Sequence, residues 1–208
     1  PGVFIDDIVV CENPLEEHRQ TSSWYFDPSY CGQARVPQEN IPAASFNERK
    51  FIARRGAMEL YHGAVVNLGT GIPNDMVGRV CNEEGISDDI MITVESGIYG
   101  GVQAGGIDFG IGQNLYAMIG HHEQMDYYNG AGVDITYMGI GELGEDGSVN
   151  STKMGVRCTG AGGFIDITQN AKKVVFLGTF TAGGAKYKFE NRKLEILQEG
   201  KIRKMVRQ

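Results

Sequence analysis

The stretch IMITVESGIYGG, residues 90–101, gives the strongest indication of the fold. Residues 90–94 form a short apolar run with β-branched side chains, which is typical of a buried strand. The run ends directly on Glu95, and a glycine-rich segment begins two residues later. The stretch therefore predicts a strand with an acid at its carboxyl end, followed by a loop.

A similar arrangement lies before this stretch. Residues 64–68, AVVNL, are predicted to be a buried strand, and Gly69–Pro73 to be a glycine turn. Pro73 suits the first turn of a helix that we expect to end near Gly85. Strands alternate with helical stretches over residues 45–180, which predicts an α/β fold with an open parallel or mixed sheet flanked by helices. Ligands of such sheets bind at the carboxyl ends of strands, where the turn and Glu95 both fall.

The other elements are less sharply marked. A helix is predicted from a cap at Ser45 to about His62, with its apolar residues on one side at helical spacing: Phe51, Ala57, Met58 and Tyr61. The remaining predictions are strands at Ile135–Met138 and Lys173–Gly178, and a hairpin of Lys186–Glu190 and Lys193–Gln198 around Asn191–Arg192.

The N-terminal region differs from the rest. Residues 1–10 resemble a strand that enters in the middle of a domain, whereas residues 11–45 are polar, contain Pro and Ser, and lack periodicity. We expect the latter to be irregular chain that wraps a surface or reaches a partner.

Composition excludes several classes of protein. The formal net charge of −7 argues against a nucleic-acid partner, because phosphates require a basic face. The sequence contains no apolar run of the roughly 20 residues that span a bilayer, so we expect no membrane association and a cytoplasmic location. The four cysteines are far apart and show no metal-ligand spacing, so we expect reduced thiols.

Glycine clusters in two places, at residues 97–112 and 155–163. Such density indicates backbone at positive φ or backbone close to a ligand, although tight surface turns explain any single glycine equally well. Glu95 is similarly open to two interpretations. A partly desolvated carboxylate between a strand and a glycine loop suits nucleophilic chemistry, but acids at strand ends commonly cap a turn or pair with arginine.

Several collinear motifs narrow the choice. LGTGIP at 68–73, TVESGIYGG at 93–101 and GAGGFIDITQNAKKVVFLGTFTAGG at 160–184 resemble the class I coenzyme A transferases, in particular the propionate or acetate CoA-transferase branch. The resemblance extends to RRGAMEL at 54–60, GGIDFG at 105–110, GVDITYMGIGELGEDGSVN at 132–150 and LQEGKIRKMV at 197–206.

This resemblance implies a NagB/RpiA-like fold and a ping-pong transfer of CoA between a short-chain acyl-CoA and a free carboxylate. Glu95 would be the nucleophile, passing through an acyl-glutamyl anhydride and a glutamyl-CoA thioester. The oxyanion hole would use backbone of Gly71, Ile72, Gly162 and Gly163. Further substrate or CoA contacts would come from Gly69, Gly97, Gly100, Gly101 and Phe164. No metal or cofactor is expected, since CoA is a substrate.

The resemblance also implies what lies around the chain. Residues 1–45 would be a junction between two halves and a wrapping segment, and residues 46–208 the catalytic domain, truncated at both ends relative to the full enzyme. We therefore expect a missing N-terminal half or a partner chain, a homo-oligomer, and incomplete activity of the chain alone.

Some features remain open. Lys153, Arg157 and Lys186 are candidates for contacts with CoA phosphates, although basic side chains are more often solvated. His121 and His122 with Glu123 and Asp126 suggest a solvated or interface stretch more than a metal site. A non-catalytic domain, or a sugar-phosphate isomerase relative with a carboxylate base, stays open as the alternative function.

Overall fold

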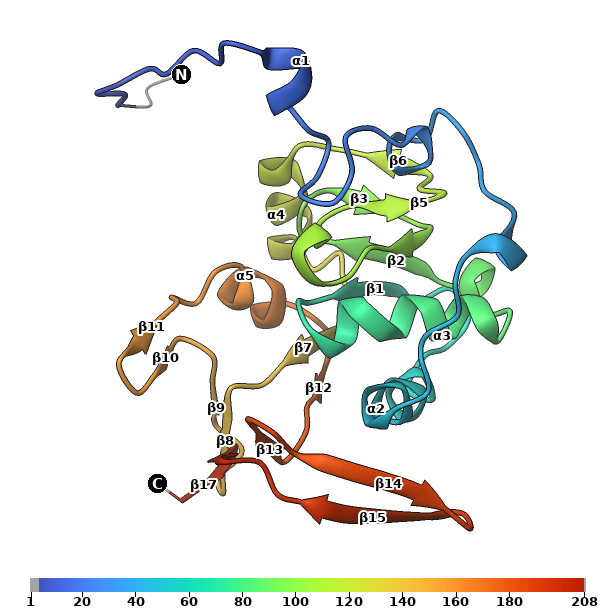
Figure 1. Ribbon diagram of the computed structural model, residues 1–208, viewed down its shortest axis with the longest axis vertical. Coiled ribbons are helices and arrows are strands. Elements are labelled where there is room, and N and C mark those ends of the chain that lie inside the picture. The colour runs from blue at the N-terminus through green and yellow to red at the C-terminus, as the bar shows by residue number, and fades with distance from the viewer. Residues whose placement is uncertain (1–3, 208) are drawn as a thin grey trace.

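A computed structural model describes residues 4–207 of the chain (Figure 1). Its centre is a six-stranded mixed sheet in the order β12-β7-β1-β2-β3-β6. The four parallel strands are β1 (Val65–Leu68), β2 (Met91–Val94), β7 (Ile135–Gly139) and β12 (Lys173–Leu177). The short strands β3 (Ile98–Tyr99) and β6 (Ala117–Met118) add to the β2 edge in antiparallel fashion. The predicted mixed α/β sheet is thus confirmed.

Helices cover both faces of this sheet, as predicted. On one face lie α2 (Glu48–Ala57), a π-helical turn η3 (Pro73–Val77) and α3 (Gly78–Glu83), which enclose the main apolar core with side chains such as Val66, Leu68 and Ile92. On the other face lie α4 (His121–Asn129) and α5 (Phe164–Gln169), which bury Tyr128 and Ile167 against β7 (Figure 1). The helices α4 and α5 had no counterpart among the predicted elements.

The predicted first helix is shorter than expected and presents a different face. Its cap is Asn47, whose side chain accepts from the Lys50 N–H at 3.1 Å, and not Ser45. Of the four apolar residues expected to be buried, Ala57 is buried, whereas Phe51, Met58 and Tyr61 are exposed. Phe51 instead stacks on Phe189 at 5.2 Å between ring centroids, a contact with a distant part of the chain.

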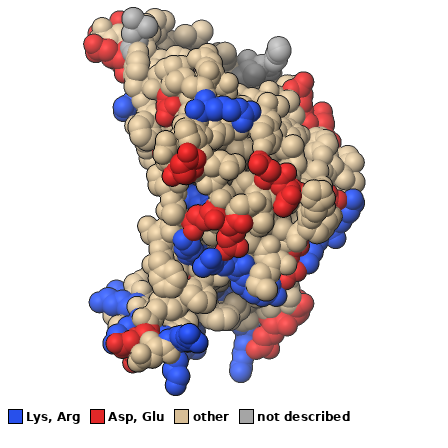
Figure 2. All heavy atoms as spheres, turned by 90° about the vertical axis from the view of Figure 1, so that its right-hand side faces the viewer, with Lys and Arg blue, Asp and Glu red and all other residues tan. Residues whose placement is uncertain are grey.

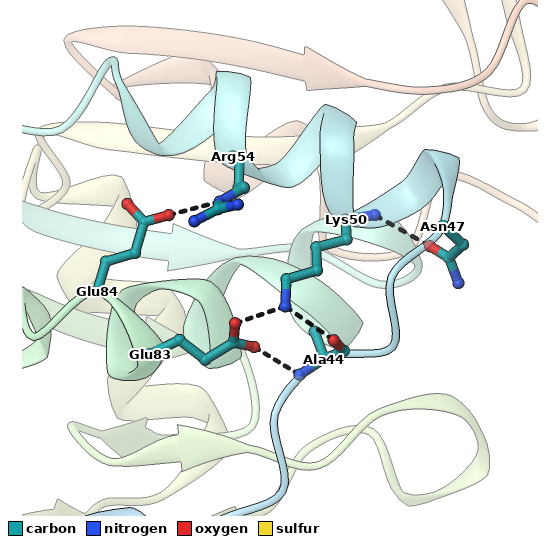
Figure 3. A network of polar contacts seen from close by, with 6 residues as sticks. All are labelled: Ala44, Asn47, Lys50, Arg54, Glu83 and Glu84. Carbon is teal, nitrogen blue, oxygen red and sulfur yellow. Dashed lines mark hydrogen bonds and ion pairs between the residues drawn. The ribbon is translucent and has the colours of Figure 1, made fainter. Parts of the chain in front are cut away.

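The actual buried face of α2 includes a charged residue. Lys50 donates through Nζ to Glu83 Oε2 of α3 at 2.5 Å and to the carbonyl of Ala44 at 2.9 Å, and Glu83 Oε1 accepts from the Ala44 N–H (Figure 3). Arg54 of α2 and Glu84, the C-cap of α3, form a second, more exposed pair. These contacts bind the segment before α2 to both helices. On this side of the molecule acidic and basic side chains are intermixed (Figure 2).

The C-terminal hairpin is confirmed in detail. Strands β14 (Lys186–Glu190) and β15 (Lys193–Gln198) pair antiparallel across a two-residue turn in which Asn191 and Arg192 have φ of 52° and 61°. Positive φ at both positions is the geometry that matches strand twist in a tight hairpin. The hairpin projects from the body of the molecule (Figure 1).

The N-terminal prediction is partly wrong. Residues 1–3 lie outside the described residues, and residues 4–10 are exposed and form no strand. Residues 11–45 are mostly irregular, as expected, with short helical turns α1 (Pro14–Glu17), η1 (Pro28–Cys31) and η2 (Gln38–Asn40). The division of the chain at residue 45 stays a prediction.

The remaining elements are short. They are the turns η4 (Ser87–Asp89) and η5 (Gly106–Asp108) and the paired strands β4 (Val102–Gln103) with β5 (Gly112–Gln113), β10 (Lys153–Met154) with β11 (Arg157–Cys158), and β13 (Thr181–Ala182) with β16 (Ile202–Arg203). A three-stranded sheet contains β8 (Glu142–Gly144), β9 (Val149–Asn150) and β17 (Met205–Val206). None of the helices within residues 4–207 combines the length and apolarity needed to cross a membrane.

Candidate active site

A pocket of about 740 Å³ lies where the four parallel strands end. Each strand contributes the residues that follow it: Gly69–Ile72 after β1, Glu95 after β2, Ile140 and Gly141 after β7, and Gly178 and Thr179 after β12. Its wall is rich in glycine: Gly69, Gly71, Gly139, Gly141, Gly160, Gly162, Gly163, Gly178, Gly183 and Gly184. Much of the surface offered to a ligand is therefore main chain.

Glu95 is the candidate nucleophile of this pocket. It is half-buried, and burial raises the pKa of its carboxyl above the ordinary value, while the nearby charge of His121 at the start of α4 acts in the opposite direction. Within the described part of the chain its carboxylate makes neither a hydrogen bond nor an ion pair with another side chain. A carboxylate that has lost water without gaining a partner is a more reactive nucleophile.

Gly163 lies directly against this carboxylate. A Cβ added at Gly163 would come within 2.3 Å of Glu95 Oε2, so the two residues meet only because residue 163 has no side chain. Gly163 has φ of −75°, a conformation open to any residue, so close approach and not backbone strain accounts for glycine here. The resemblance placed both residues in one site, and the structure brings them together.

Two further predicted loops meet at the same pocket. Gly69 donates its N–H to the carbonyl of Tyr137 at 2.8 Å, and Gly71, at φ +91°, turns the chain into η3. The N–H groups of Gly71, Gly162 and Gly163 make no backbone hydrogen bond elsewhere within residues 4–207. They are thus available to an oxyanion. Ile72 and Phe164 also line the pocket.

Gly97, Gly100 and Gly101 are placed elsewhere. Among the described residues that line the pocket none of the three occurs, and each has a positive φ of 71° to 105°. An added Cβ would meet the carbonyl of Ile119, the ring of Tyr116 and the carbonyl of Gln113, respectively. Their glycines are explained by turn geometry and close strand packing, and their role in substrate binding stays a prediction.

The basic residues of the pocket differ from the candidates chosen by sequence. Lys153, Arg157 and Lys186 are exposed and lie beside lining residues without lining the pocket themselves, so a role with phosphates stays a prediction for them. Arg49 and Lys204 do line it. Arg49 pairs with Asp75 at 2.5 Å, while Lys204 donates to the Ile140 carbonyl at 3.0 Å. Arg49 lies in the first turn of α2, and Lys204 lies between two short strands that the sequence did not predict, so no local signal marked either residue.

The structure offers no alternative metal centre in its described part, where no group of three or more His, Cys, Asp or Glu side chains is arranged around one point. His121 and His122 are exposed at the start of α4. All four cysteines are unpaired, and Cys81 of α3 is buried in the core.

A curated relative gives the first comparison. The chain is 39% identical over 213 residues to caffeate CoA-transferase of Acetobacterium woodii and 43% identical over 208 residues to acetate CoA-transferase YdiF of Escherichia coli K12. Both matches include the whole of this chain, which spans only 40% and 38% of the relatives' own lengths. No protein-family model matches the chain.

Solved structures agree with these matches. The apoenzyme of the acyl-CoA transferase YdiF from E. coli O157:H7 superposes with a TM-score of 0.77 at 36% identity, over 90% of this chain and 35% of that one. A thioester complex of the same protein with CoA gives a TM-score of 0.72 at 37% identity, over 88% of this chain and 35% of that one.

Proposed function

This chain belongs to the CoA-transferase family, and we propose that it holds the catalytic half of an enzyme that transfers CoA between a short-chain acyl-CoA and a free carboxylate. The observation that supports this most directly is the half-buried Glu95 carboxylate without a side-chain partner, placed in a pocket at the strand ends. Glu95 is the proposed nucleophile.

The proposed reaction has two half-reactions. A carboxylate oxygen of Glu95 attacks the thioester carbonyl of the donor, the C–S bond breaks, and CoA leaves as a thiolate, so an acyl-glutamyl anhydride remains. The thiolate then attacks the glutamyl carbonyl and the donor acid leaves as a carboxylate. The resulting glutamyl-CoA thioester reacts with an acceptor carboxylate by the same steps in reverse. No water and no net oxidation is involved.

Main-chain groups would stabilise the charge that develops. Each attack passes through a tetrahedral oxyanion, and Gly71, Gly162 and Gly163 line this pocket with N–H groups that make no backbone hydrogen bond within residues 4–207. The backbone of Ile72, which follows Gly71 and also lines the pocket, is part of the same proposed oxyanion hole. Removing one such donor in other acyl transfers costs about 3–4 kcal/mol of transition-state stabilisation. The glycine-rich wall would thus supply hydrogen-bond donors to the oxyanion in addition to forming turns.

The relatives support both the proposed thioester intermediate and the proposal that a further half completes the enzyme. One of them has been crystallised as a thioester complex with CoA, which is the type of intermediate proposed for Glu95. Because the chain spans about two fifths of its relatives, we propose that a further half, in the same polypeptide or in a partner chain, completes the enzyme. A cytoplasmic homo-oligomer remains part of this proposal.

Trapping the covalent intermediate tests the function. The complete enzyme is incubated with an acyl-CoA, treated with hydroxylamine and digested, and the peptide containing Glu95 is measured by mass spectrometry. We expect a hydroxamate on Glu95, and none in Glu95→Gln, which should also lose CoA exchange. An isomerase that uses the carboxylate as a base would stay unlabelled but lose turnover on Glu95→Gln. A binding domain would stay unlabelled and keep its function.

A further inference from the structure

Lys204 is a pocket residue that the proposed chemistry does not use. It lies between β16 and β17 and lines the pocket together with Ile140. Its backbone is held on both sides, because its N–H donates to Phe180 at 2.9 Å and its carbonyl accepts from the Leu143 N–H at 2.7 Å. The side chain crosses to the end of β7, where Nζ donates to the Ile140 carbonyl at 3.0 Å.

The charge of Lys204 has no carboxylate to pair with in residues 4–207. The lysines that form ion pairs there are Lys50, Lys172, Lys173 and Lys188, each with an aspartate or glutamate. Lys204 is half-buried, and desolvation alone lowers the pKa of its ammonium group. A neutral carbonyl compensates a buried charge only in part, so an anion bound beside Lys204 would stabilise its ammonium group further.

The sheet gives the distance from this point to Glu95. Glu95 follows β2 and Ile140 follows β7, and β1 lies between these two strands. Two strand spacings separate the strand ends by about 10 Å, since neighbouring strands are about 4.8 Å apart. The proposed nucleophile and the ammonium group of Lys204 therefore line the pocket at strand ends that β1 separates.

This separation limits which anion can reach Lys204. Three covalent bonds of extended chain span about 3.8 Å, so the far carboxylate of a four-carbon diacid bound at Glu95 falls well short of about 10 Å. The pantetheine arm of CoA contains more than three times as many bonds between its sulfur and its first phosphate. A phosphate at the end of that arm can reach Lys204 while the sulfur is at Glu95.

We propose that Lys204 binds a phosphate of CoA and so sets the direction in which the substrate lies, from Glu95 along the strand ends toward β7. This assignment rests on the proposed function for the identity of the ligand. It makes Lys204 a specificity residue that distinguishes CoA thioesters from thioesters that lack phosphate.

Binding measurements test the assignment separately from catalysis. In the Glu95→Gln background of the complete enzyme, affinities for CoA, dephospho-CoA and pantetheine are measured by calorimetry. Lys204→Gln should weaken CoA about tenfold or more, as expected for loss of a charge-assisted hydrogen bond, and leave pantetheine unchanged. Lys204→Arg should restore most of the loss. Dephospho-CoA shows whether the pyrophosphate or the additional phosphate is bound.

The matched control is Lys201→Gln, an exposed lysine three positions earlier that does not line the pocket, which should leave all three affinities unchanged. Equal weakening of CoA and pantetheine by Lys204→Gln would overturn the assignment, as would no weakening of either. A fall in melting temperature with unchanged affinities would show instead that Lys204 pairs with an acid elsewhere in the assembled enzyme. Success here with no trapped intermediate at Glu95 would separate CoA binding from the proposed transfer.

Discussion

Replacing Gly163 by alanine should displace the reactive carboxylate. The added Cβ would lie 2.3 Å from Glu95 Oε2, 3.0 Å from Met125 Cε and 3.2 Å from Ile167 Cδ1. An ordinary contact needs roughly 3.4 Å or more, so the carboxylate must retreat by about 1 Å. Because a misplacement of about 1 Å in a reacting group can cost on the order of a hundredfold in rate, we expect CoA exchange to fall about that much.

The same substitution should affect stability much less than catalysis. Overpacking costs about 1–3 kcal/mol, and Gly163 has a negative φ that alanine accepts without strain. The assays are initial rates of CoA exchange and the melting temperature of the complete enzyme. Glu95→Asp withdraws the carboxylate, so in the double variant Gly163→Ala should cost less than it does alone.

A control and a clear refutation are available. Gly130→Ala, at the end of α4 with φ of −77° and outside the pocket, should keep exchange within about twofold. If Gly163→Ala is folded and retains exchange at a similar level, the carboxylate does not lie against Gly163 in the working enzyme. The proposed geometry of the nucleophile would then be wrong.

Three further outcomes follow from charges in the fold. Because the pKa of Glu95 is raised, the folded state binds a proton more readily than the unfolded state, and stability falls as pH rises between the two pKa values. Glu95→Gln should remove this cost and raise the melting temperature at pH 7. Exchange requires the carboxylate, so its rate should rise with pH through a pKa above that of an ordinary glutamate, and a midpoint at or below the ordinary value would contradict the desolvated site. Lys50→Met should cost about 1–3 kcal/mol of unfolding free energy, because Glu83 loses its ammonium partner, and denaturant titration against the exposed Lys193→Met measures this.

The sequence predicted the parallel core well because its strands are marked locally. Each of β1, β2, β7 and β12 is a short run of β-branched and apolar residues, and turn-forming glycine or proline residues lie close to most of them. The hairpin turn could also be predicted from the sequence, since Asn191 favours the positive φ that it adopts. These elements depend on neighbours in the chain more than on distant contacts.

The misplaced elements depend on contacts between distant residues. Phe51 was expected in the core by helical spacing, but it packs against Phe189 of the hairpin. Lys50 takes the buried position because Glu83 and Ala44 satisfy its charge, and no pattern within α2 shows this. The helix α4 is polar in sequence and is held to the sheet by Tyr128, whose hydroxyl bonds to Thr93 and Asn67.

The candidate site was predicted unevenly for a related reason. Glu95, Gly71 and Gly163 lie at strand ends or glycine turns, so both position and resemblance marked them. Gly97 and the glycines near it also lie in a glycine-rich stretch after a strand, so the sequence did not distinguish them from pocket residues. In the structure, close packing against Ile119 explains why residue 97 is glycine. Lys204 reaches the pocket through the pairing of β16 and β17 with distant strands, which single-sequence periodicity does not reveal.

The projecting hairpin has a consequence for how the molecule behaves in solution. Strand β15 is exposed along its whole length, and in the described chain it pairs with β14 alone. Its outer edge therefore offers unpaired N–H and C=O groups beside the exposed side chains of Leu194, Ile196 and Leu197. Such an edge can template strand addition and aggregation, while Lys193 and Glu195 supply the alternating charge that discourages it. Self-association at high concentration is therefore expected to start at this edge, where these five residues set the balance between strand addition and charge repulsion.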